Sequence, residues 1–207
     1  MADKVNRIKQ SLLYSQLSLF GFLIICSILK PNVVAINGGV SNYGKYKQTV
    51  ALYVLGFLLN IVFLWRASNQ IVKLKNSNHS IRLLLQILAG LTLLVLISTF
   101  PRYLKTIYST IHDDFGIALY SYEFLLSIWF ILKIRTRLSV SLFTVEFLGS
   151  FIGLLSILKV IHLLYVGQFI GAAGFGALMV LIFPAILELL PNKTHDPLIK
   201  PKTPQPI

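Results

Sequence analysis

The sequence predicts an all-α fold, a polytopic integral membrane bundle of six helices, from its composition and from the length of its apolar runs. Of 207 residues, 56% are hydrophobic and 13% are charged, and the mean hydropathy is +0.76. A soluble domain carries about 25% charged residues, so a water-soluble fold would leave too much apolar surface exposed. Several runs reach the roughly 20 apolar residues that cross about 30 Å of hydrocarbon. Each must be helical, because lipid offers backbone groups no hydrogen-bond partner.

Six apolar runs have the length of a span. They cover residues 12–29, 48–66, 82–100, 114–134, 138–161 and 165–190. The chain therefore divides into a polar N-terminal segment at 1–10, a six-span domain at 11–190 and a proline-rich tail at 191–207.

Basic residues predict that both termini are cytoplasmic. Thirteen of the 19 lysines and arginines fall in the N-terminal segment, the loops after the second and fourth spans, and the tail. The other six fall on the opposite side, which agrees with the excess of positive charge in cytoplasmic loops. Termini on one side require an even number of spans, and six satisfies this requirement.

The net charge of +12 does not predict a nucleic-acid partner, because the basic residues are spread over the ends of the apolar runs. Basic residues in such positions meet anionic lipid headgroups, so membrane lipids are the expected partners. An alternative for the first span is a cleavable signal peptide, with Val33 and Ala35 as small residues before the cleavage site. The run is long for a signal core, and its removal would leave five helices.

Three polar residues are expected deep in the membrane. Counting about 1.5 Å of rise per residue places Asn60, Glu123 and Glu146 near one level. The spans that carry the two glutamates are joined by a short turn, so their carboxyls should approach each other. An ionised carboxylate there costs at least about 2.5–3.5 kcal/mol, which predicts that both face the bundle interior. The group could serve as a proton relay or as an ion or polar-headgroup site, or it could be a hydrogen-bonded clamp that holds the second, fourth and fifth spans together.

A second polar group is expected at the outer side, as a pocket for a ligand. A short amphipathic helix over residues 102–112, between the third and fourth spans, could lie in the interface and cover this pocket. The candidate residues are Ser41, Asn42, Gly44, Arg102, His112, Asp113, Asp114, Lys159 and His162.

Two chemistries compete for part of this outer group. Lys159 could pair with Asp113 or Asp114, and an ion-pair network is the favoured interpretation. Alternatively, His112, Asp113 and His162 could bind zinc, which prefers imidazole and carboxylate ligands. No HxxxH or HExxH spacing supports a metal site, and no cofactor is expected. We find no nucleophile or phosphate-binding motif, so the sequence favours a protein that is not an enzyme.

Small residues in the last two spans predict close helix packing. The sixth span carries Gly167, Gly171, Gly174 and Gly176, and the fifth carries a matching pair, Gly149 and Gly153. Such faces let backbones approach each other. We expect packing within the chain, with a homodimer as the alternative. Pro184 should kink the sixth span near its inner end.

Short motifs carry a resemblance to a known family. The run VSNYG at residues 40–44 follows the first span, and Phe100-Pro101 and Ile111-His112 bracket the loop between the third and fourth spans. This layout resembles the six-helix bacterial membrane family DUF998 and, more distantly, the DRAM/Sfk-type membrane family. The resemblance implies a bacterial cytoplasmic membrane location, a shared outer-face group of Ser41, Gly44, Pro101 and His112, and no agreed chemistry. Asn42 and the missing proline before the second span depart from the family pattern.

Three functions follow as hypotheses. The first is a non-enzymatic bundle that binds a lipid headgroup or a membrane partner in the outer pocket. The second is a small proton-coupled transporter that uses Glu123 and Glu146. The third is a metal-dependent intramembrane hydrolase.

Overall fold

The computed structural model describes residues 2–35, 38–74, 79–100 and 106–189, and none of these residues lies in a β-strand. Within this part of the chain, six helices are long and apolar enough to cross a membrane, which confirms the predicted six-helix membrane bundle. The long helices are α1 (Ala2–Leu29), α3 (Val50–Ile71), α4 (His79–Thr99), α5 (Thr106–Lys133), α6 (Arg137–Ile157) and α7 (Leu164–Leu181). The short ones are α2 (Asn32–Ala35), the 3-10 helix η1 (Val40–Lys45) and α8 (Phe183–Glu188).

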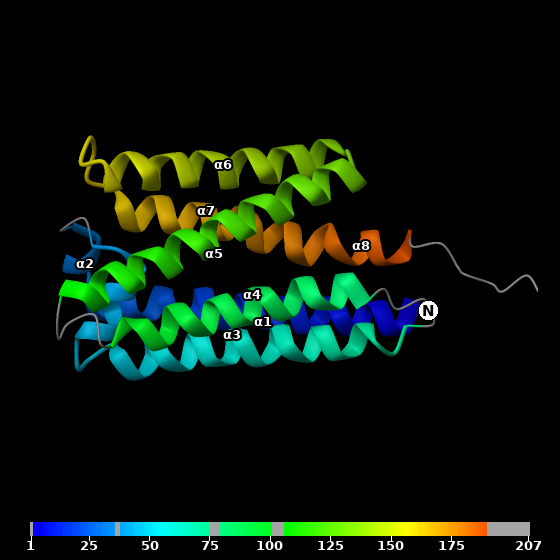
Figure 1. The fold of residues 1–207 in the computed structure, drawn as a ribbon, viewed down its shortest axis with the longest axis horizontal. Coiled ribbons are helices and arrows are strands. Elements are labelled where there is room, and N and C mark those ends of the chain that lie inside the picture. The colour runs from blue at the N-terminus through cyan, green and yellow to red at the C-terminus, as the bar shows by residue number, and fades with distance from the viewer. Residues whose placement is uncertain (1, 36–37, 75–78, 101–105, 190–207) are drawn as a thin grey trace, which may run out of the picture.

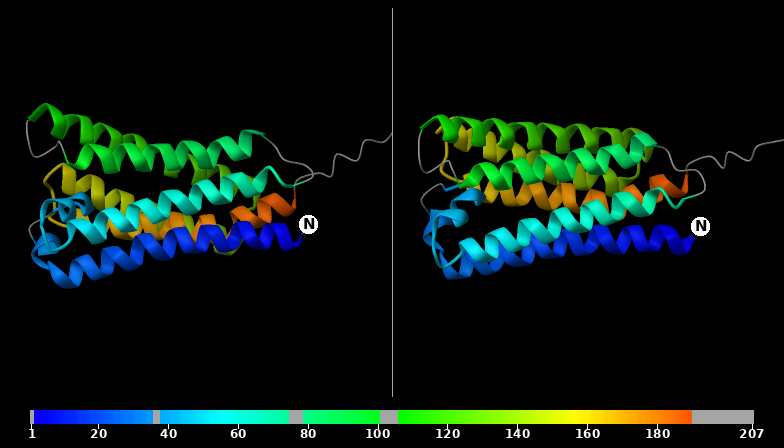
Figure 2. Two further views of the ribbon diagram at one scale, coloured as in Figure 1. Left: turned by 90° about the horizontal axis from the view of Figure 1, so that it is seen from below. Right: turned by 60° about the horizontal axis from the view of Figure 1, so that its bottom comes forward.

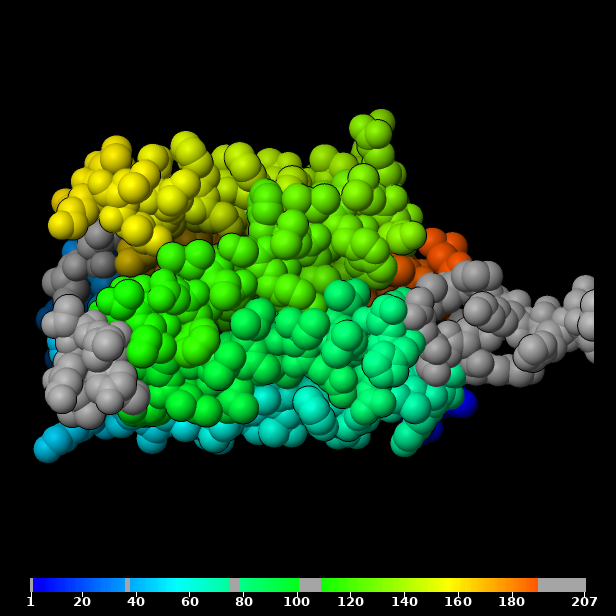
Figure 3. Space-filling model, viewed as in Figure 1, coloured from blue at the N-terminus to red at the C-terminus, as the bar shows by residue number. Residues whose placement is uncertain are grey.

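The long helices run side by side along one axis (Figure 1). α1 packs against α3, α3 against α4, and α6 against α7, while α5 crosses obliquely from α4 to α6. Figure 3 shows α5 at the surface between α4 and α6. The start of α1 and α8 lie at one end of the bundle, the terminal end, whereas α2, η1 and the start of α5 lie at the other, the η1 end (Figures 1 and 2).

The first helix is longer than the predicted span at 12–29. It begins at Ala2, so the N-terminal segment belongs to the bundle rather than preceding it. Val5 and Ile8 are 3% and 0% exposed, and with Leu12 they recur at helical spacing on one buried face. The polar residues of this segment take the opposite face, where Asp3 and Arg7 form an exposed ion pair of 3.2 Å.

The expected interfacial helix at 102–112 is not a separate element in the described residues. From Thr106 onward this segment forms the first turns of α5, which continues to Lys133. No proline interrupts this stretch, so helical hydrogen bonding continues into the span. Residues 101–105, with Arg102, lie outside the described residues.

The small-residue faces of α6 and α7 pack against each other, which confirms the predicted packing within the chain. A Cβ atom at Gly149 would overlap the backbone of Gly171, and one at Gly167 would overlap the backbone of Gly153. The two backbones therefore touch along this face. The predicted interruption at Pro184 is also present, because α7 ends at Leu181 and α8 starts at Phe183 with the proline in its first turn.

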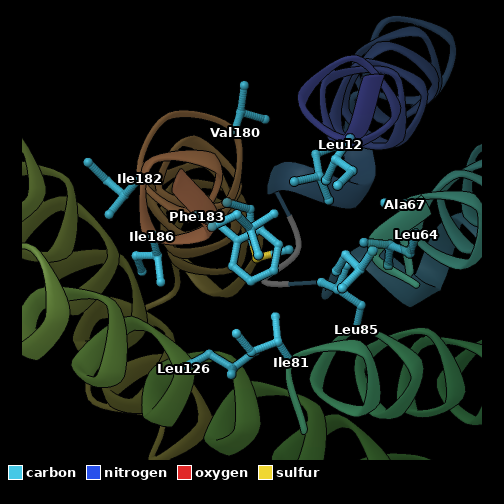
Figure 4. Packing of buried hydrophobic residues seen from close by; sticks show 14 of the residues in the cluster. Leu12, Leu64, Ala67, Ile81, Leu85, Leu126, Val180, Ile182, Phe183 and Ile186 are labelled. Atoms are coloured by element: carbon cyan, nitrogen blue, oxygen red, sulfur yellow. The ribbon is translucent and has the colours of Figure 1, made fainter. Parts of the chain in front are cut away.

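A large hydrophobic cluster fills the terminal half of the bundle. Figure 4 shows Phe183 of α8 among side chains from the surrounding helices. It is 1% exposed, and Leu12, Leu64 and Leu85 belong to the same cluster. A second, smaller cluster at the η1 end is rich in tyrosine and includes Tyr43, Tyr53 and Tyr165.

Candidate functional site

A cavity of about 120 Å³ lies inside the η1 half of the bundle. Its wall includes side chains from α1, η1, α3, α4, α5 and α7. It extends from Val40 and Ser41 of η1 to Leu64 and Leu88, which belong to the hydrophobic cluster of the terminal half. Along α3, the ten residues from Val50 to Asn60 correspond to about 15 Å of helix, so the cavity reaches well into the spans.

The cavity joins residues that the sequence placed in two separate groups. Ser41 and His112, expected in the outer pocket, line the same space as Asn60 and Glu123, expected deep in the membrane. An outer pocket and a mid-membrane polar group are therefore parts of one site in this structure.

Asn60 is held by the first helix. Its Nδ2 atom donates to the Ser15 backbone oxygen at 3.1 Å and to the Ser15 hydroxyl at 2.8 Å. Both residues are buried, at 3% and 0% exposure. These bonds join α3 to α1 and fix the Asn60 amide at the cavity wall, whereas the sequence suggested a clamp with the two glutamate helices.

The two glutamates differ in their surroundings. Glu123 of α5 is half-buried on the cavity wall and makes no hydrogen bond or ion pair with another described residue. Glu146 of α6 is 2% exposed, lies outside the cavity wall, and packs against Gly174, where a Cβ atom would come within 2.5 Å of the Glu146 nitrogen. The carboxyls are close enough to interact electrostatically.

Glu146 has an unusual environment for a carboxyl group. Its Oε2 atom is buried with no hydrogen-bond partner among the described residues, and the same holds for the hydroxyl of Ser127 on α5. The Ser127 hydroxyl and the Glu146 carboxyl are nevertheless close enough to interact with each other, and no other described group bonds these two atoms. α6 therefore holds a polar group behind the cavity, on the face that carries the small residues.

Gln168 connects η1 to α7 at the edge of the cavity. Its side-chain oxygen accepts from the Val40 backbone N–H at 2.8 Å, and its backbone oxygen accepts from the Tyr120 hydroxyl at 3.2 Å. A Cβ atom at Gly39 would lie 3.0 Å from the same side-chain oxygen, so η1 sits directly on Gln168. α7 thereby positions η1, which follows the first helix.

A cluster of three hydroxyl groups joins η1 to α1 and α7. Ser27 donates to the Leu23 carbonyl at 2.8 Å, which leaves its oxygen to accept from Tyr43 at 3.0 Å and from Tyr165 at 2.6 Å. The two tyrosine rings meet edge to face, 5.8 Å apart. Burial raises the pKa of Tyr43 to about 12, so its hydroxyl remains a donor at neutral pH.

His112 is buried at the η1 end of the cavity, at 5% exposure. Its Nδ1 atom lies 3.0 Å from the hydroxyl of Ser98. Ser98 donates to the Val95 carbonyl at 3.0 Å, which leaves Nδ1 of His112 as the donor in the first bond. The ring is thus oriented by α4 at the cavity wall.

The structure separates other members of the expected outer group from the cavity. Asp113, Asp114, Lys159 and His162 are exposed and do not line it. Lys159 makes no ion pair with a described residue, and it follows α6 in the left-handed region with φ of 60°.

Asn42 and Gly44 act within η1 itself. The Asn42 backbone N–H donates to the Gly39 carbonyl at 2.9 Å. Gly44 is buried where a Cβ atom would lie 2.7 Å from the Thr99 side chain and 3.3 Å from the Tyr53 ring, so it is needed for packing.

The metal hypothesis gains no ligand group from the structure. In the described ranges, no three histidine, cysteine or acidic side chains are grouped so that they could hold a metal ion. His112 is buried in the cavity wall, whereas His162 is exposed beyond the end of α6.

Sequence reasoning missed several residues of the wall. Gln16, Tyr120 and Gln168 were not identified, and neither were the aromatic residues. A signal was present on α3, where Tyr53, Phe57 and Asn60 lie at i, i+4 and i+7 and so share one helix face.

Comparisons of this chain with protein-family models, curated proteins and solved structures found no match. The resemblance to DUF998 therefore stays a prediction. The chain is a multi-pass integral membrane protein.

Proposed function

We propose that this chain is a non-enzymatic membrane protein that binds a lipid headgroup, or a molecule of similar size, in the cavity of the η1 half. The observation that carries this proposal is the convergence of polar side chains from separate helices on one cavity. Polar groups at membrane depth are costly and commonly mark functional sites. Ligand sites combine an apolar wall with a few oriented polar groups, as this cavity does.

The volume limits the ligand. An apolar cavity of about 150 Å³ can hold a benzene molecule, and this cavity measures about 120 Å³. It therefore accepts a group of roughly benzene size. The tip of a lipid headgroup fits this limit, whereas a whole phospholipid does not.

The distribution of basic residues supports a cavity that faces away from the cytoplasm. Of the basic residues in the described part of the chain, nine belong to segments at the terminal end and four to segments at the η1 end. Under the positive-inside rule, the η1 end lies on the outer side of the membrane, so the ligand approaches from that side. The family resemblance implies that this membrane is the bacterial cytoplasmic membrane.

A second candidate function is proton-coupled transport. It is favoured by the position of Glu123 on the cavity wall with Glu146 directly behind it. Proton flux into liposomes should then fall to background in both Glu123→Gln and Glu146→Gln. Unchanged flux in the two variants would remove this candidate.

A cavity-filling variant tests the binding function. A Cβ atom at Gly116 meets nothing within 4 Å, and Gly116 lines the cavity, so Gly116→Leu should occupy it without a clash at the backbone. Gly90 is equally open but lies outside the cavity wall, which makes Gly90→Leu a matched control.

Native mass spectrometry of protein released from mild detergent provides the measurement. We expect a retained small-molecule or lipid mass on the wild type and on Gly90→Leu, and its loss on Gly116→Leu. Equal retention by all three proteins would place the ligand elsewhere and contradict the proposal.

A further inference from the structure

The cavity wall has a specific chemical composition. Among the described residues that form it, Glu123 is the only carboxylic acid, and there is no lysine or arginine. The aromatic side chains of the wall are Phe20, Tyr53, Phe57, Tyr120, Phe169 and Phe175. One carboxyl group is thus combined with many aromatic faces.

This combination matches the recognition of an organic cation. Aromatic faces attract ammonium groups, and the attraction reaches about 2 kcal/mol or more where water is excluded. Glu123 adds a full countercharge and has no partner among the described residues. An anion would instead meet the same carboxylate without any lysine or arginine to balance it.

We propose that the ligand is an organic cation, whose substituted ammonium group lies between the carboxylate of Glu123 and the aromatic rings of the wall. This inference rests on the proposed function, since it names the chemical class of the ligand for the same cavity. A quaternary ammonium group is about the size that the cavity accepts, and it requires no hydrogen bonds from the wall.

Metal cations fit the wall less well. Calcium takes 6–8 oxygen ligands and magnesium needs near-octahedral oxygen geometry, whereas Glu123 is the only carboxylate among the described wall residues and the other side-chain oxygens are neutral amides and hydroxyls. A substituted ammonium group is weakly hydrated, so it loses less hydration free energy on leaving water than a small metal ion does.

Charge balance defines the binding step. An ionised carboxylate in the empty cavity is costly at this depth, so the empty site holds a proton on Glu123. When the cation enters, that proton leaves to solvent and an ion pair forms. The titratable groups facing Glu123 are Glu146 of α6 and Tyr120 of its own helix, with Tyr53 and His112 farther along the wall.

The same chemistry can come from two sources. One is a free small cation such as choline, and the other is the headgroup of a choline lipid. Both present a trimethylammonium group, and they differ in whether the cation is tethered to the bilayer.

Calorimetry on the full chain in nanodiscs of phosphatidylglycerol tests the proposal with choline, tetramethylammonium and 3,3-dimethylbutan-1-ol as probes. The last probe is a neutral molecule with the shape of choline. We expect at least one cation to bind at least tenfold more tightly than the neutral probe, and the release of protons on binding.

Three variants locate the site. Glu123→Gln should weaken cation binding at least tenfold, whereas Glu146→Gln, which removes a carboxyl outside the wall, should change it less than threefold. Phe57→Leu should weaken it severalfold and keeps the test informative if Glu123→Gln unfolds. Thermal melting of each variant provides the check on folding.

The outcomes separate the inference from the proposed function. The cation proposal is overturned if choline and the neutral probe bind equally well. It is also overturned if Gly116→Leu loses a retained native ligand but no cation binds to the wild type. Either result leaves a ligand-binding cavity. Absence of both a cavity-dependent native ligand and any probe binding overturns both. In phosphatidylcholine nanodiscs, weakened choline binding identifies the lipid headgroup as the source, and unchanged binding identifies the free cation; either result supports the shared chemistry.

Discussion

The two halves of this bundle use the same helices for different purposes. In the η1 half, α3 presents Tyr53, Phe57 and Asn60 to a cavity. In the terminal half, the same helix presents Ala67 and Ile71 to a hydrophobic cluster. One end of the molecule holds a space with polar groups on its wall, and the other is filled by apolar side chains.

This difference shows where stability resides. Lipid tails are as apolar as leucine, so helices in a membrane associate through packing and hydrogen bonds rather than through burial from water. A cavity removes packing contacts without any compensating burial. We therefore expect the terminal half and the α6–α7 pair to hold the bundle together, while the η1 half loses some packing to form a site.

The largest effect should come from removing the centre of the terminal cluster. Phe183 is 1% exposed, and Phe183→Ala leaves a void that should destabilise the fold by about 3–5 kcal/mol. Phe57→Ala makes the same change at the cavity wall, where an empty space already exists, and should lose less than half as much. Steric-trap or denaturant unfolding in detergent micelles measures both. Equal losses would break the comparison between the halves.

The glycine face should show a sharp difference over one helical turn. A Cβ atom at Gly149 overlaps the backbone of Gly171, so Gly149→Ala should cost about 1–3 kcal/mol. At Gly153, the nearest atom to an added Cβ lies 3.9 Å away, and Gly153→Ala should be tolerated. Thermal melting of the two proteins provides the measurement. Similar melting temperatures would show that α6 and α7 are not in direct backbone contact.

The hydrogen bonds of Asn60 should contribute less. Asn60→Ala removes both bonds to Ser15, and polar contacts between membrane helices average about 0.6 kcal/mol with a maximum near 1.7 kcal/mol. We expect a loss in that range, determined by unfolding in the same micelles. Ser15→Ala deletes the hydroxyl acceptor alone and should lose less. A cost above that of Gly149→Ala would show that polar contacts dominate the η1 half.

The smallest effect should come from the Tyr43 hydroxyl. Tyr43→Phe removes its bond to Ser27 and should cost about 0.6 kcal/mol at neutral pH. The pKa of Tyr43 is raised to about 12, so the native state keeps a proton that the unfolded chain releases near pH 10. Wild-type stability should therefore fall relative to Tyr43→Phe as pH rises from 10 to 12. A constant difference across that interval would contradict the assigned burial.

The sequence could predict the features that depend on local pattern. The number of spans follows from hydrophobic length, and the α6–α7 contact follows from glycines at helical spacing. The interruption before α8 follows from the geometry of Pro184. The burial of the N-terminal segment could also have been read from the spacing of Val5, Ile8 and Leu12.

The cavity could not be predicted, because it depends on how helices are placed relative to one another. Depth arithmetic gives the level of Glu123 but not the direction it faces. The oblique path of α5 brings His112 and Glu123 to one wall. Asp113 is the next residue after His112, yet it is exposed and lies outside the cavity wall. The residues around Gln168 in the sequence do not indicate its role, because that role depends on a contact with Val40 of η1, far away in the chain.

The terminal cluster joins the first helix to the last. Val5 and Ile8 of α1 share it with Phe183 and Leu187 of α8. At a translation rate of about 5–20 residues per second, α1 precedes α8 by roughly 10–35 s. During that interval α1 can pair with α3 in the membrane, but its other partners do not yet exist. Completion of this fold therefore waits for the insertion of the final span, and a chain that stops before α8 leaves the cluster without Phe183 and Leu187.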